Sequence, residues 1–164
     1  MRRIVIGLAL CLGACSSSKD GEEGSKARAG DGTMLSPYLA IGDTLAADEI
    51  DGLDKLAAQV ITAAEGKDAD AGVADLIQGA GRVGARDIAT ARTAYKKMSA
   101  GMIEWMKAHP DAQDGHMIVH CTMTFGGKGG VWVQKKGKIF NPYEGHMMLH
   151  CGDVVDWSDP VPQT

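Results

Sequence analysis

The stretch DIATARTAYKKMSAGMIEWMKAHP, residues 87–110, carries the strongest helical signal in the chain and sets the fold class. Asp87 stands where a helix N-cap is favoured, and Pro110 prevents the helix from continuing beyond His109. Apolar side chains recur three or four residues apart and so share one helix face: Ile88, Ala91, Tyr95, Met98, Met102 and Trp105. We interpret the methionines of this segment, Met106 included, as core packing, because methionine often fills gaps in helical cores.

The residues before this helix predict three more helices. Ser36 can cap the first and Pro37 suits its first turn, while Asp48 can cap a second helix that continues to Ala64. A shorter third helix is expected over residues 73–80. Glycine-rich stretches separate these segments, so residues 36–110 predict an antiparallel bundle of about four helices.

The residues after His109 change to a β pattern. HMIVHCTM (116–123) is rich in apolar and β-branched residues, and GVWVQKK (130–136) alternates apolar with polar ones. TFGGKGG between them is typical of a hairpin connection. KIFNPYEG (138–145) predicts a strand-like piece and a turn, and HMMLHCG (146–152) a single helical turn.

These patterns predict an α+β fold, in which the helical bundle (36–110) precedes a small antiparallel β unit (111–158) and packs with it as one domain. With 45% hydrophobic and 23% charged residues among 164, the chain suits one globular domain. The net charge of −4 is scattered along the chain and provides no basic stripe, which argues against a nucleic-acid partner.

The N-terminal residues predict export and lipidation. A basic start (MRR) and a short apolar run (residues 4–14) form a signal peptide over residues 1–14, too short to span a membrane. The run ends in LGAC, which looks like a bacterial lipobox whose Cys15 is acylated, for example with palmitate, and becomes the mature N-terminus. Residues 15–35 then form a polar tether. We therefore expect a lipoprotein of the cell envelope, facing the periplasm from either membrane.

Two cysteines remain for the folded part of the chain, Cys121 and Cys151, because Cys11 leaves with the signal and Cys15 carries lipid. In an oxidising compartment such a pair is by default a disulfide. Closing a loop of about 30 residues would stabilise the fold by roughly 3.5 kcal/mol.

A soft-metal site is the alternative to that disulfide. Met123 follows Cys121 by two residues, which would place both side chains on one strand face, and Met148 precedes Cys151 by three, which would place both on one helical turn. Thiolate and thioether sulfur favour Cu(I), or Ag(I) in its place, over zinc. Further candidate ligands stand beside these sulfurs, namely His120, Met147, His150 and His146.

No catalytic constellation is recognisable in the sequence. The cysteines form no Cys-x-x-Cys motif, and no nucleophile has an evident base and orienting partner. A binding protein is therefore favoured over an enzyme, with thiol–disulfide redox activity as a further alternative and a disulfide-stabilised interaction lipoprotein as another.

The stretch HCTMTFGGKGGVWVQKKGKIFNPYEGHMMLHCGDV (120–154) resembles a small uncharacterised domain of exported bacterial proteins, found alone or fused to periplasmic adaptor subunits of heavy-metal efflux pumps. That family carries Cys-Pro-Met, Lys-Gly, Asn-Pro-Tyr and Met-Leu-x-Cys-Gly after a helical region. The elements that match here are Cys121 with Met123, Lys128 with Gly129, Asn141 to Tyr143, and Met148 to Gly152. Thr122 departs from the family's proline.

This resemblance covers roughly residues 36–155 and implies copper handling. It implies metal ligation by Cys121, Met123, Met148 and Cys151. The expected role is copper buffering, tolerance or delivery, with a heavy-metal efflux system or another envelope copper protein as partner.

Overall fold

The computed structural model describes residues 33–162. The predicted signal peptide, the lipidated Cys15 and nearly all of the predicted tether lie outside these residues. No helix of the described part is long and apolar enough to cross a membrane.

The helical half has the predicted bundle. Its four helices are α1 (Leu35–Ala46), α2 (Leu53–Ala64), α3 (Val73–Val83) and α4 (Ile88–Ala108). A short fifth helix, α5 (Thr124–Gly127), lies inside the β unit. The predicted ends of the longest helix are confirmed, because Asp87 caps α4 by accepting a hydrogen bond from the Thr90 N–H, and α4 ends at Ala108.

The predicted starts of the first two helices are wrong. α1 begins at Leu35 with Met34 as its N-cap, and Met34 is 1% exposed, so the domain begins before Ser36. α2 begins at Leu53 after Gly52, whose left-handed backbone (φ 80°) ends the preceding turn. Asp48 therefore caps no helix here. Its carboxylate instead binds residues far away in the sequence, which helix-capping patterns do not anticipate.

The β unit is a three-stranded antiparallel sheet in the order β2-β1-β3, from β1 (His116–Cys121), β2 (Gly130–Lys135) and β3 (Asp153–Val155). The predicted hairpin of the first two strands is confirmed, with Cys121 opposite Gly130. β3 is a correction, because the sequence pattern predicted no strand after the helical turn of residues 146–152. Residues 138–145 form a turn and no strand, and the predicted helical turn is a 3-10 helix, η2 (Gly145–Met147).

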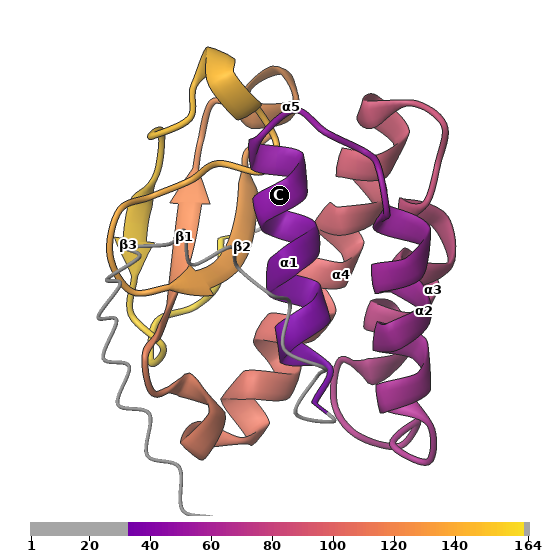
Figure 1. Cartoon of the computed structure of the whole chain (residues 1–164). Coiled ribbons are helices and arrows are strands. Elements are labelled where there is room, and N and C mark those ends of the chain that lie inside the picture. The colour runs from indigo at the N-terminus through magenta and orange to yellow at the C-terminus, as the bar shows by residue number, and fades with distance from the viewer. Residues whose placement is uncertain (1–32, 163–164) are drawn as a thin grey trace, which may run out of the picture.

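The elements form three layers, as Figure 1 shows, with α1 and α4 between the sheet and the pair α2 and α3. One core joins helices and sheet, and its partly buried margin extends from Leu35 to Val161. The methionines Met98, Met102 and Met106 are fully buried in it, as predicted. Helical bundle and β unit therefore share their hydrophobic interior.

Among the described elements, α3 and α4 make the most extensive contact, and this contact depends on glycines. A Cβ at Gly79 would stand 2.7 Å from the carbonyl oxygen of Ala94 and 2.8 Å from the backbone nitrogen of Met98. Gly101 on α4 is similarly pressed against Gly72 and Leu76. Backbone atoms cannot yield as flexible side chains do, so these positions require the absence of a side chain.

We expect Gly79→Ala to lower the free energy of unfolding by about 2 kcal/mol, because overpacking against backbone outweighs the better helix propensity of alanine. Gly81→Ala on the same helix is the matched control, since a Cβ there meets nothing within 4 Å. The control should stabilise by about 0.5–1 kcal/mol. Urea unfolding measures both, and equal effects of the two substitutions would contradict the close packing.

Candidate functional site

The two cysteine patches meet at one end of the sheet. Cys121 is the last residue of β1 and Cys151 lies two residues before β3, and the two form a disulfide with a Cα–Cα distance of 5.8 Å. Cys121 is 1% exposed, whereas Cys151 is only partly buried. The cysteine pair is thus a disulfide in the structure, which is the first of the two predicted alternatives. The same bond brings together the two sulfurs that the alternative metal site would need.

The two methionines of the predicted site lie beside this disulfide in sequence but differ in exposure. β1 ends at Cys121, so the prediction that Met123 continues the strand is wrong; Met123 has helical backbone angles and is 61% exposed. Met148 is partly buried, and its carbonyl accepts a hydrogen bond from the Cys151 N–H at 3.0 Å, closing a tight turn. Each cysteine therefore has a methionine two or three residues away.

The remaining candidate ligands are spread over the same end of the molecule. His120 lies in β1, opposite Val131 of β2 and Asp153 of β3. The Nδ1 atom of His150 lies 2.7 Å from the carbonyl oxygen of Ile139. His146 is bonded to Asp48, and Met147 is 82% exposed. Within residues 33–162 no three His, Cys, Asp or Glu side chains lie close enough to hold a metal ion, a criterion that leaves methionine ligands aside.

Asn141 fixes the second cysteine segment from within. Its buried amide donates to the carbonyl oxygen of Cys151 at 3.1 Å, and its backbone N–H donates to that of Leu149 at 2.8 Å. The amide oxygen accepts from the backbone N–H groups of Tyr143 and Glu144. The Asn-Pro-Tyr turn therefore holds residues 149–151 in place.

Tyr143, the last residue of that turn, ties the β unit to the helices. Its hydroxyl donates to the carbonyl oxygen of Val131 at 2.6 Å and lies 3.1 Å from the Ser99 hydroxyl of α4. The Tyr38 hydroxyl of α1 lies 2.8 Å from the same Ser99 oxygen and accepts from the Val133 N–H. Burial raises the pKa of both tyrosines, so both remain neutral donors.

Asp48 connects three separate parts of the chain. One carboxylate oxygen accepts from Arg92 of α4 at 2.5 Å, and the other accepts from the backbone N–H of His146 at 2.9 Å and lies 2.7 Å from its Nδ1. Arg92 also donates to the carbonyl oxygens of Leu45 and Pro142. The hydrogen bonds from His146, followed by Arg92, hold the pKa of Asp48 at about 2.

Sequence reasoning identified the cysteines and missed the groups that position them. Ser99 appears as a polar residue inside an apolar helix, and Arg92 as one charge among many, so neither carries a distinctive local signal. Asn141 and Tyr143 were singled out only through the family resemblance. Several of their partners lie far away in the sequence: Ser99 bonds to Tyr38 and Tyr143, and Arg92 to Pro142, at separations of 61, 44 and 50 residues, beyond the reach of a periodic pattern.

Comparisons of the chain with protein-family models, with curated proteins and with solved structures found no match.

We expect Asp48→Asn to lower the free energy of unfolding at pH 7 by about 1 kcal/mol, a modest value because the side chain is 38% exposed and water screens its charge. A carboxyl pKa lowered from 3.8 to about 2 stabilises the fold above pH 4, and this stabilisation is lost as the pH falls toward 2. The difference between Asp48→Asn and wild type should therefore shrink over that interval. Glu104→Gln, on the exposed side of α4, is the control and should show no such convergence.

Proposed function

We propose that this protein is a lipid-anchored component of the bacterial cell envelope that binds Cu(I), with Ag(I) as a mimic, and buffers copper or passes it to an efflux system. The observation that supports it best is the meeting of Cys121 and Cys151 from segments 30 residues apart. Met123 and Met148 stand within three residues of these cysteines. The two segments joined by the disulfide therefore carry two thioethers and two potential thiolates between them.

The chemistry of this donor set favours a soft monovalent ion. Thiolate and thioether sulfur bind Cu(I) well, whereas zinc sites rarely include methionine. Met123 is 61% exposed and Met147 is 82% exposed, so an incoming ion can reach thioether sulfur without opening the core. His120, His146 and His150 would complete the ligand set in a mixed site.

Metal binding requires the reduced form of the cysteine pair. Reduction breaks the Cys121–Cys151 bond with two electrons and two protons, which a dithiol reductant of the envelope supplies as it becomes a disulfide itself. The two thiols then lose their protons as they bind the ion. The disulfide form would be the metal-free, oxidised state of the protein.

A disulfide-stabilised interaction lipoprotein is the second candidate, and the bond itself favours it. In this alternative the cysteine pair only stabilises the β unit, and the protein acts by contacting a partner. Thiol–disulfide redox activity would use the same pair, without any Cys-x-x-Cys motif.

We expect the reduced chain from residue 16 onward to compete with a Cu(I) chelator for one ion, and the oxidised chain to bind at least tenfold more weakly. Cys121→Ser and Met148→Leu should each weaken binding by tenfold or more, about 1.4 kcal/mol, because each removes a sulfur ligand. Met117→Leu, at the far end of β1, removes a thioether elsewhere and should have no effect.

Survival of the affinity in both site variants would refute the metal assignment. Mass measurement after thiol alkylation, with and without copper, separates the two candidates. A disulfide that persists in the presence of copper and a reductant favours the interaction lipoprotein.

Lipid anchoring is tested separately through Cys15. Acylated cysteine should place the wild-type chain in the membrane fraction of the cell, because two or more acyl chains hold a protein stably at a bilayer. Cys15→Ser should abolish acylation, measured by labelled palmitate incorporation, whereas Cys11→Ser should leave it intact. Equal labelling of the two variants would contradict the assignment of Cys15.

A further inference from the structure

The disulfide between Cys121 and Cys151 is unequally covered at its two ends. Cys121 is 1% exposed and belongs to the hydrophobic core, whereas Cys151 is only partly buried at the margin of that core. Thiol–disulfide exchange begins when a thiolate reaches one sulfur of the bond from the side opposite the other sulfur, so access decides which sulfur is attacked. A thiolate that approaches from outside therefore meets Cys151, and Cys121 is the leaving group.

Contacts on both sides keep the bond in this orientation. The carbonyl oxygen of Cys121 accepts a hydrogen bond at 3.3 Å from the hydroxyl of Thr124, which is 0% exposed. Gly152, which follows Cys151, is packed so closely on the sheet that a Cβ there would stand 2.5 Å from a methyl carbon of Val119. Cys121 therefore cannot turn its buried side outward without breaking these contacts.

The exposed apolar side chains of the described residues belong to the β unit that carries this bond. Within residues 33–162 the large apolar side chains that remain exposed are Met123, Phe140, Met147 and Val154. Val154 of β3 pairs with Val119 of β1, two residues before Cys121, so Val154 and Cys121 share one face of the sheet. Apolar side chains left exposed together are typical of a surface that meets another protein.

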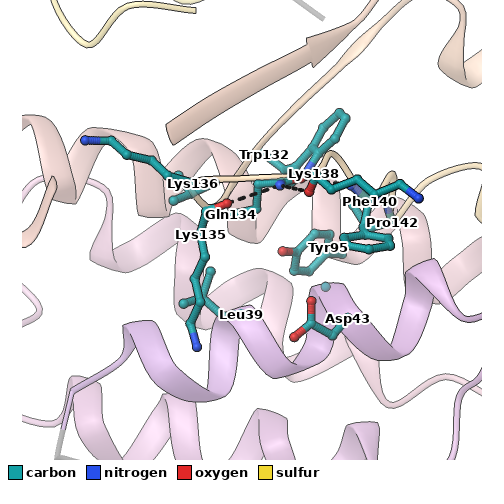
Figure 2. A pocket seen from close by; sticks show the side chains of 12 residues that line it. Leu39, Asp43, Tyr95, Trp132, Gln134, Lys135, Lys136, Lys138, Phe140 and Pro142 are labelled. Atoms are coloured by element: carbon teal, nitrogen blue, oxygen red, sulfur yellow. Dashed lines mark hydrogen bonds between the residues drawn. The ribbon is translucent and has the colours of Figure 1, made fainter. Parts of the chain in front are cut away.

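The loop that carries Phe140 is held in place from two directions. The backbone N–H of Phe140 donates to the side-chain oxygen of Gln134 at 3.1 Å (Figure 2). The next residue, Asn141, donates to the carbonyl oxygen of Cys151 at 3.1 Å. The Phe140 ring also contacts the ring of His150, with centroids 5.7 Å apart. Phe140 and the Cys151 segment are thus ordered together, and a surface ordered in advance costs a partner less to bind.

We propose that the Cys121–Cys151 disulfide is an exchange site for a protein dithiol, whose thiolate attacks Cys151 and expels Cys121. The exposed apolar side chains of the β unit receive the partner's surface around its reactive thiolate. This inference rests on the proposed function, in which the pair must be reduced before it binds copper.

The exchange has two steps. The partner's first thiol gives its proton to solvent, its thiolate forms a bond to the sulfur of Cys151, and the Cys121–Cys151 bond breaks, so that Cys121 leaves with the electron pair and takes up a proton. The partner's second thiol then loses its proton, attacks the partner's own sulfur in the mixed disulfide and releases Cys151, which is protonated in turn. Two electrons and two protons thus pass to the cysteine pair, and the partner becomes a disulfide.

The test traps the mixed disulfide on the unaltered cysteine pair, so no cysteine variant of this chain has to fold. The chain from residue 16 onward has no other cysteines. It is mixed, without copper, with a thioredoxin whose second active-site cysteine is replaced by serine, which blocks the second step. Free thiols are then alkylated in denaturant and the peptides are identified by mass spectrometry. Thioredoxin should be found on Cys151 about tenfold more often than on Cys121, which should carry the alkyl group.

Three outcomes are decisive. Thioredoxin on Cys121, or equally on both cysteines, would overturn the assigned direction. Exchange no faster than global unfolding of the chain would show a purely structural bond and would overturn the exchange site. Copper takes no part in this measurement, so a chain that exchanges at Cys151 but binds no Cu(I) after reduction would refute the proposed function alone.

Surface variants test the contact with the partner. Met147→Gln and Val154→Thr replace exposed apolar side chains, and each should slow reduction by wild-type thioredoxin about threefold. Reduction by dithiothreitol, which is too small to use this surface, should keep its rate. Ala58→Gln, at an exposed position of α2, is the control and should change neither rate. Unchanged rates with thioredoxin in both variants, or equal slowing with dithiothreitol, would overturn the protein partner.

Discussion

α4 is packed on two sides, and both halves of the molecule depend on it. One side meets α3 across glycines that leave no space between the helices, and the other side meets β2. Between these contacts the buried hydroxyl of Ser99 bonds to Tyr38 of α1 and to Tyr143 of the β unit. A helix that is buried on both sides cannot shift without disturbing either layer. The helical bundle therefore fixes the position of the sheet, and the sheet in turn fixes the position of the cysteine pair.

The parts of the fold that local sequence determines were predictable. The N-cap at Asp87, the end of α4 before Pro110 and the hairpin of β1 with β2 each follow from a few neighbouring residues. The parts that depend on distant partners were not. β3 has only three residues, and it is a strand because its backbone pairs with β1. Asp48 has the local sequence context of a helix cap, but its actual partners are Arg92 and His146, which are distant in the sequence.

The candidate site divides in the same way. The residue types predicted that Cys121 and Cys151 belong together, and the fold places them in bonding contact. The sequence could not decide between a disulfide and a metal site, because both require the same proximity of two sulfurs. It also misplaced Met123, since where a strand ends depends on its pairing partners: β1 and β2 part after Cys121 and Gly130, and the chain turns into α5.

The attachment of the second cysteine segment has a kinetic consequence. Residues 149–151 are held by Asn141, and the β3 ladder begins two residues later, so the disulfide is one of several bonds that keep this segment at the end of β1. Breaking one tether while others persist leaves the two thiols at a high effective concentration relative to each other. When an external disulfide oxidises one thiol by forming a mixed disulfide, the second thiol is then already in place to displace it and close the Cys121–Cys151 bond. Any ion that bound these sulfurs would likewise meet two donors already held close together.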